Sequence, residues 1–305
     1  MRNASAKILI VLGMLVVAGF MLTGGCRRFS SNPELASVEE MLSADRLEAA
    51  TGALARYTAA HPADPAAQQL AVLLALKQDR LDRTGILLSD LPDSTAFMAG
   101  LLTHRDPVVR ANVARLICER SLPVALSALL NALDDPTPNV RSYCAEAVGH
   151  RHNPVTIKAL FRLLGDDNWF VRAKAASALA EIGDPRAAGW LLELINEGDP
   201  ALRIHMILAL RQLASPSNQA LLHRAYRRAS PSKQFAIVLV LAKLSDPVAL
   251  GQLTNAVTDP DVVNRRLAAG ALGDFPKPVA KESLERFSRD EDERVRREAL
   301  QAMQR

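Results

Sequence analysis

The chain has 305 residues, of which 49% are hydrophobic and only 4% aromatic. Its apolar residues are mainly Ala and Leu, which favour close-packed helices over strands. The formal charge of +4 gives the sequence as a whole no reason to bind nucleic acid or an anionic membrane. Three cysteines without a CxxC pair exclude a disulfide framework and a zinc knuckle. We expect two of them, Cys118 and Cys144, to be small buried residues.

Residues 1–25 have the pattern of an export signal. Arg2 and Lys7 precede an apolar run over 8–22, which is shorter than the roughly 20 residues that span a bilayer. The letters LTGGC at 22–26 resemble a bacterial lipoprotein signal, although Thr23 stands where Leu is usual, and this implies a lipidated Cys26. The alternative is an uncleaved N-terminal anchor. Both place the chain in the cell envelope, facing the periplasm or the cell exterior, with 26–33 as a short tether.

Residues 34–92 are predicted to be a helical cap. The letters DRLEAA at 45–50, followed by Leu54, Tyr57 and Pro62, resemble one unit of the tetratricopeptide repeat. Asp64 and Pro65 then open a second amphipathic helix, which carries Leu residues at 70, 73, 74 and 76. A segment of this kind covers the first face of a stacked array, which would otherwise expose its core.

From residue 93 to 305 the sequence repeats every 31 residues. Arg recurs at this interval with one interruption at Gln234, at Arg110, Arg141, Arg172, Arg203, Arg265 and Arg296. We call these six residues the arginine ladder. Pro recurs at Pro123, Pro154, Pro185, Pro216, Pro247 and Pro278, and Leu follows six residues after each Pro. Three ladders in phase predict a repeat architecture.

Each repeat is predicted to hold two helices. The first helix carries the ladder Arg, and the second helix carries the Leu that follows each Pro, which we call the Leu ladder. A residue that can cap a helix stands four positions before every ladder position, at Asp106, Thr137, Asn168, Asp199, Ser230, Asp261 and Asp292. From there apolar residues recur at spacings of three and four, and the Pro ladder starts the second helix. Two antiparallel helices with one apolar face each must stack on their neighbours, so the sequence predicts an all-α solenoid.

The letters LGDDNWFVR at 164–172 and the run over 173–185 resemble the HEAT family, in particular its short lyase-type repeats. The resemblance implies a right-handed α-solenoid of two-helix repeats. It also implies that an acid in the turn accompanies the Arg six residues later, as in Asp135/Arg141, Asp166/Arg172, Glu197/Arg203, Asp259/Arg265 and Asp290/Arg296. Because of these acids, we interpret the arginine ladder as a structural contact between repeats and not as a track for phosphates.

The chemistry of an enzyme is not evident. HEAT-type hydroxylases carry His-Glu pairs, whereas none of the six histidines here precedes Glu, so we expect no metal, no cofactor and no di-iron site. The turn with His150 and His152 is interpreted as a solvated loop. No nucleophile elbow and no phosphate loop occurs. Some HEAT-like proteins are DNA glycosylases and others attach bilin pigments, but export disfavours both functions. An enzyme or accessory subunit acting on a protein substrate remains the alternative.

The remaining candidate is a surface for a protein or peptide partner. The Arg-bearing helices are expected to line the concave side, where residues one, two and five after each ladder position point outward. In the middle repeats these residues turn apolar, at Ile204, His205, Leu208, Phe235, Leu239 and Leu267. An exposed apolar patch of this kind is typical of a partner site, although tight curvature could bury it. The sequence therefore predicts a membrane-anchored scaffold or adaptor.

Overall fold

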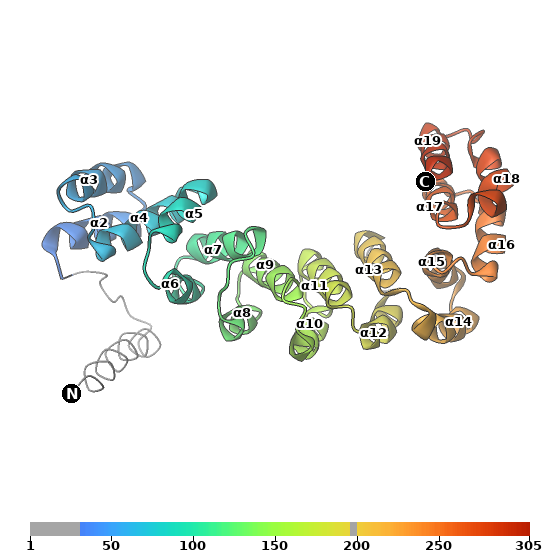
Figure 1. Cartoon of the computed structure of the whole chain (residues 1–305), viewed down its shortest axis with the longest axis horizontal. Coiled ribbons are helices and arrows are strands. Elements are labelled where there is room, and N and C mark those ends of the chain that lie inside the picture. The colour runs from blue at the N-terminus through green and yellow to red at the C-terminus, as the bar shows by residue number, and fades with distance from the viewer. Residues whose placement is uncertain (1–30, 196–199) are drawn as a thin grey trace, which may run out of the picture. The chain divides into compact units, whose positions relative to one another are not determined.

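The computed structural model describes residues 31–195 and 200–305, which form 18 α-helices and contain no strand (Figure 1). The predicted all-α repeat fold is confirmed. The predicted export signal over 1–25 and Cys26 lie outside the described residues. Within the described ranges, no helix combines the length and the apolar character needed to cross a bilayer.

Packing divides the chain into two compact units, which end and begin at Ala147 and Val148. The first unit holds α2 (Pro33–Ser43), α3 (Leu47–Ala60), α4 (Pro65–Lys77), α5 (Leu81–Ser89), α6 (Ser94–Leu101), α7 (Pro107–Glu119), α8 (Leu126–Ala132) and most of α9 (Pro138–Gly149).

The second unit continues the alternation of first and second helices. It holds α10 (Ile157–Leu163), α11 (Trp169–Ile182), α12 (Arg186–Leu194), α13 (Pro200–Leu213), α14 (Gln219–Arg228), α15 (Pro231–Ala242), α16 (Pro247–Asn255), α17 (Val262–Leu272), α18 (Lys277–Phe287) and α19 (Glu293–Gln304). The short 3-10 helices Pro154–Thr156, Pro216–Asn218 and Ala256–Thr258 adjoin α10, α14 and α16.

The first helices begin at the predicted capping residues. Asp106, Asn168, Asp261 and Asp292 each accept a hydrogen bond from the backbone amide two residues later, which satisfies a donor that the helix leaves open. Asp246 caps the second helix α16 in the same way, from the amide of Val248. The capping pattern in the sequence thus marks helix starts correctly.

The Leu ladder forms the centre of the core. Its members are at most 3% exposed: Leu129, Leu160, Leu191, Leu222, Leu253 and Leu284. The first helices add mainly Ala and Val, as in α11, where Val171, Ala175 and Leu179 are buried. Cys118 and Cys144 are buried, as expected.

The N-terminal segment packs on the beginning of the array. Helix α4 contacts α2 and α3 on one side and α7 on the other. Lys77, at the end of α4, pairs with Asp45 and lies 2.6 Å from the carboxylate of Asp106, which caps α7. The side chain of Lys77 is only 8% exposed, so this ion pair fixes the segment to the first repeat from inside the stack.

Consecutive first helices approach closely where small residues face each other. A Cβ added at Gly149 would lie 2.8 Å from both Cα and Cβ of Ala178 on α11. The same register recurs at Gly273, where an added Cβ would lie 3.1 Å from the Cβ of Ala302 on α19. The absence of a side chain therefore sets the spacing of these helices.

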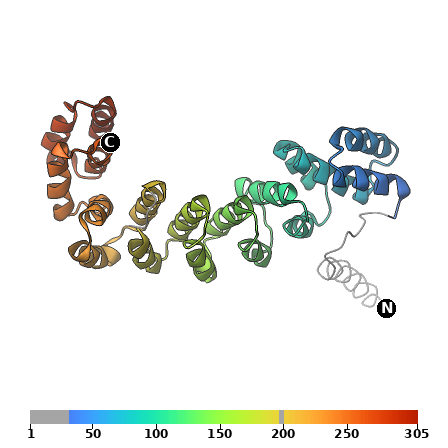
Figure 2. The same cartoon turned by 180° about the vertical axis from the view of Figure 1, so that it is seen from behind.

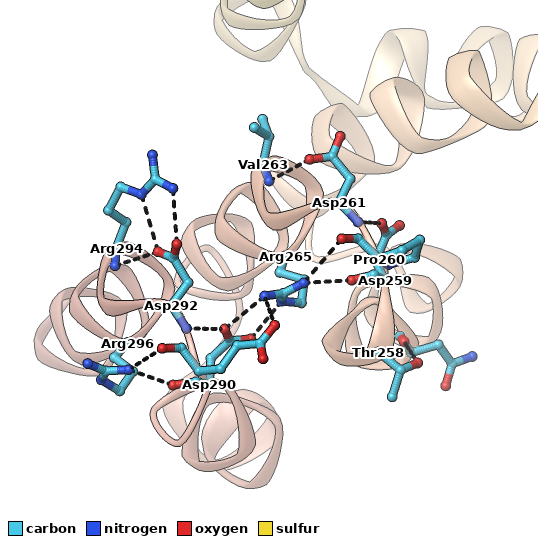
Figure 3. A network of polar contacts seen from close by, with 12 residues as sticks. Thr258, Asp259, Pro260, Asp261, Val263, Arg265, Asp290, Asp292, Arg294 and Arg296 are labelled. Carbon is cyan, nitrogen blue, oxygen red and sulfur yellow. Dashed lines mark hydrogen bonds and ion pairs between the residues drawn. The ribbon is translucent and has the colours of Figure 1, made fainter.

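Two members of the arginine ladder, Arg110 and Arg265, join their repeat to the next one. Figure 3 shows Arg265 between two turns: its Nη1 donates to the carbonyl of Asp259 (2.9 Å), and its Nε donates to the Asp290 carboxylate (2.8 Å). Arg110 repeats this geometry, with Nη1 on the carbonyl of His104 (2.8 Å) and Nε on Asp135 (2.6 Å).

The carboxylate partner is therefore the acid 25 residues after the Arg, in the following repeat. The residue six before the Arg supplies its backbone carbonyl, also to Arg141, Arg172 and Arg296. Because a carbonyl is present in any residue, His104 replaces the acid before Arg110 without loss of this contact.

We predict that Gly149→Ala lowers the free energy of unfolding by about 1–3 kcal/mol, because the added methyl group meets the backbone of α11. Urea unfolding followed by circular dichroism measures it. The matched control is Gly251→Ala in α16, where nothing lies within 4 Å of the added Cβ. This change should raise stability by roughly 0.5–1 kcal/mol through helix propensity. Equal stability of the two variants would contradict the close approach.

We predict that Asp290→Asn lowers the free energy of unfolding by about 2 kcal/mol, because Arg265 loses a charged hydrogen-bond partner. Both side chains are less than a tenth exposed, so water does not replace the lost partner. Asp82→Asn is the control, because the pair of Asp82 and Arg120 lies on the surface and should contribute little. Similar losses in both variants would show that the ladder contact is not special.

Candidate partner-binding surface

The ladder changes at the junction of α13 and α15. Residue 228, 25 residues after Arg203, is the basic Arg228, so the register that supplies Asp135 and Asp290 elsewhere offers no carboxylate here. Arg203 Nη1 donates instead to the hydroxyl of Ser232 (3.1 Å). In the next repeat Gln234 replaces Arg and donates to the carbonyl of Tyr226 (3.1 Å).

The opposite ends of the same helices are joined differently. Arg211, near the end of α13, donates to the carbonyl of Leu239 on α15 and to the carboxylate of Asp274 after α17, both at 2.5 Å. Gly149 and Gly273 occupy the register that Arg211 takes here. The α13–α15 junction thus carries a long side chain in the register where Gly149 and Gly273 have none.

An exposed apolar surface lies on the first helices at this junction. Leu208 is 57% exposed, Trp169 44% and Ile204 40%, while His205 and Phe235 are half-buried. Their helices α11, α13 and α15 pack in sequence, and they follow one another in both views of the fold (Figures 1 and 2). We call Trp169, Ile204, His205, Leu208 and Phe235 the apolar face.

Aromatic contacts organise one end of this surface. The ring of Trp169 lies 5.6 Å from that of Phe170 in an edge-to-face arrangement and 6.3 Å from that of His205 on the next first helix. The ammonium group of Lys174 lies 5.5 Å from the centre of the Phe170 ring. The apolar face is therefore continuous across α11 and α13.

The structure changes the predicted membership of this surface. Ile204, His205, Leu208 and Phe235 lie together on it, whereas Leu239 is buried at 3% exposure and cannot contact a partner. Leu239 is buried because α15 packs against α13 and against α17. Leu267 on α17 is half-buried.

Sequence reasoning missed Trp169 and Phe170, which precede the ladder position and so fell outside the rule of residues one, two and five after it. Two adjacent aromatic residues in a chain with 4% aromatic residues were the available signal.

The histidines make local contacts. His223 lies 2.8 Å from the carboxylate of Asp246, which also accepts from Gln219 (2.7 Å). Burial raises the pKa of Asp246, but these bonds and the Val248 amide bring it below its ordinary value. A ring nitrogen of His152 lies 2.9 Å from the carbonyl of Glu181, and His150 lies 3.7 Å from the Glu181 carboxylate. The turn at 150–152 therefore packs on α11 and is not a free loop.

The comparisons with known proteins agree with the repeat geometry. HEAT repeats match at residues 94–168, 126–211, 188–262 and 218–304, which together cover more than half of the chain. The chain belongs to the HEAT-repeat family. No curated protein matches the sequence.

Solved structures show distant likeness to this HEAT-repeat chain. The complex of CpcE and CpcF of phycocyanin lyase from Nostoc sp. PCC7120 is 19% identical, with a TM-score of 0.42, covering 68% of this chain and 92% of that one. Human deoxyhypusine hydroxylase is 18% identical, with a TM-score of 0.31, covering 78% and 96%. An engineered protein is 18% identical, with a TM-score of 0.46, covering 99% and 91%.

Proposed function

We propose that this chain is a membrane-anchored scaffold of the cell envelope that binds a protein or peptide partner through the apolar face. The observation that carries the proposal is the exposure of Leu208, Trp169 and Ile204 on consecutive first helices. Exposed apolar surface on a soluble unit costs free energy in water and is commonly covered by a partner. The stacked helices of α-solenoids present extended surfaces for this purpose.

The proposal assigns binding and no catalytic step to the chain. The apolar face offers rings, aliphatic side chains and one imidazole, which suit a protein surface with complementary apolar residues. A helix laid across α11, α13 and α15 is one natural ligand, because its apolar stripe matches the row of exposed side chains.

The location in the cell envelope rests on the sequence of residues 1–26. A lipid on Cys26 would hold the array near the membrane through the short tether, and the uncleaved anchor would do the same.

We predict that Leu208→Asp reduces capture of the natural partner at least about tenfold, because burying a Leu side chain contributes roughly 1.5–3 kcal/mol. The measurement is affinity capture from membranes, quantified by mass spectrometry against the unchanged chain. Val279→Asp is the control, since Val279 is 48% exposed on α18 and lies outside the apolar face. An unchanged set of captured proteins with Leu208→Asp would refute the proposed function.

We predict that Cys26→Ser releases the chain from the membrane fraction, because the lipidated residue is lost. Cell fractionation and the intact mass of the chain measure this, and the unchanged chain should carry a lipid on an N-terminal Cys26. A Cys26→Ser chain that stays in the membrane with Met1 retained would instead support the uncleaved anchor.

A further inference from the structure

Five basic residues stand close in sequence or register to the missing acid of the α13–α15 junction. Arg224, Arg227 and Arg228 stand at i, i+3 and i+4 on α14, so they share one face of that helix, and all three are exposed. Arg203 and Lys233 are half-buried and lie in the first turns of α13 and α15, which pack on each other. We call these five residues the basic edge.

The basic edge has no internal counter-charge among the described residues. None of its five members forms an ion pair with a carboxylate in residues 31–195 or 200–305, and within these ranges Arg203 donates to the neutral hydroxyl of Ser232. At two other junctions the ladder Arg forms an ion pair with a carboxylate at this position. Arg110 pairs with Asp135, and Arg265 pairs with Asp290. Like charges that gather without a partner repel one another and attract an anion.

The basic edge continues directly into the apolar face. Arg203 precedes Ile204 on α13, and Lys233 stands two residues before Phe235 on α15, which packs against α13. A ligand that lies on Leu208 and Phe235 therefore passes the basic edge at the beginning of these helices. A ligand segment that binds both the apolar face and the basic edge therefore needs apolar and acidic side chains together.

We propose that the α13–α15 junction binds an acidic amphipathic segment of the protein partner, and this rests on the proposed function. A carboxylate of the segment takes the place of the missing repeat acid between Arg203 and Arg228, where guanidinium groups offer paired donors. Its apolar residues lie on Ile204, Leu208 and Phe235. The ladder favours a protein over a lipid headgroup, because its other junctions hold carboxylates at this position.

The test uses the full chain and two labelled synthetic peptides of helical Leu periodicity, one with Glu and one with Gln at the polar positions. Fluorescence anisotropy measures the dissociation constants. The Glu peptide should bind at least about tenfold more tightly than the Gln peptide, and added salt should weaken it. The decisive variant is Arg228→Glu, which restores the repeat acid beside Arg203. It should lose affinity for the Glu peptide at least about tenfold without a lower melting temperature.

The matched control is Arg286→Glu, an exposed arginine in the last turn of α18, which should leave the affinity unchanged. Equal binding of the Glu and Gln peptides, or full binding by Arg228→Glu, would overturn the proposal. Displacement of the Glu peptide by phosphatidylglycerol vesicles, but not by phosphatidylcholine vesicles, would also overturn it and indicate a membrane contact.

The outcome separates this inference from the proposed function. Leu208→Asp tests capture of the natural partner through the apolar face, and Leu208→Ala tests it without adding a charge. If Leu208→Asp loses that partner while Arg228→Glu retains it, the scaffold function stands and only the acidic segment is refuted.

Discussion

One carboxylate shared between two repeats is the interaction on which the array depends. Asp290 accepts from Arg265 of the preceding repeat with its carboxylate, while its backbone carbonyl accepts from Arg296 of its own repeat. The same carboxylate accepts from the amide of Asp292, the residue that caps α19. Turn, cap and junction therefore meet at a single residue, Asp290. Since a two-helix repeat cannot bury its apolar faces alone, such a clamp fixes the register in which the Leu ladder of one repeat meets the next.

The α13–α15 junction departs from this scheme in a way that bears on function. It lacks the carboxylate at one end and holds Arg211 between helices at the other. A carboxylate at position 228, as in most other repeats, would neutralise the charge of Arg203 within the chain. Its loss leaves positive charge beside exposed apolar side chains, which is the combination that a partner with acidic and apolar residues can cover. Structure and proposed function meet at a junction where the repeat pattern is interrupted.

Much of the fold could be predicted from the sequence, because its determinants are local. The caps at Asp106 and Asp292, and the buried Leu ladder, follow from spacing along single helices. The partner of each ladder Arg could not be predicted in the same way. The resemblance to HEAT repeats associates it with an acid six residues earlier, whereas stacking brings the acid 25 residues later, in the next repeat, to Arg265. Burial of Leu239 and exposure of Trp169 likewise depend on how closely neighbouring helices approach, which no single repeat specifies.

Hydrogen exchange of the full chain, followed by mass spectrometry, tests the central claim most directly. If a shared carboxylate holds each junction, local opening should require less free energy at α13–α15 than at α17–α19. The account predicts faster exchange in the first turns of α15 than in those of α19, because Gln234 and Arg228 stand where the latter junction has Arg296 and Asp290. Equal protection of the two junctions would contradict the claim that this carboxylate governs the stability of the stack.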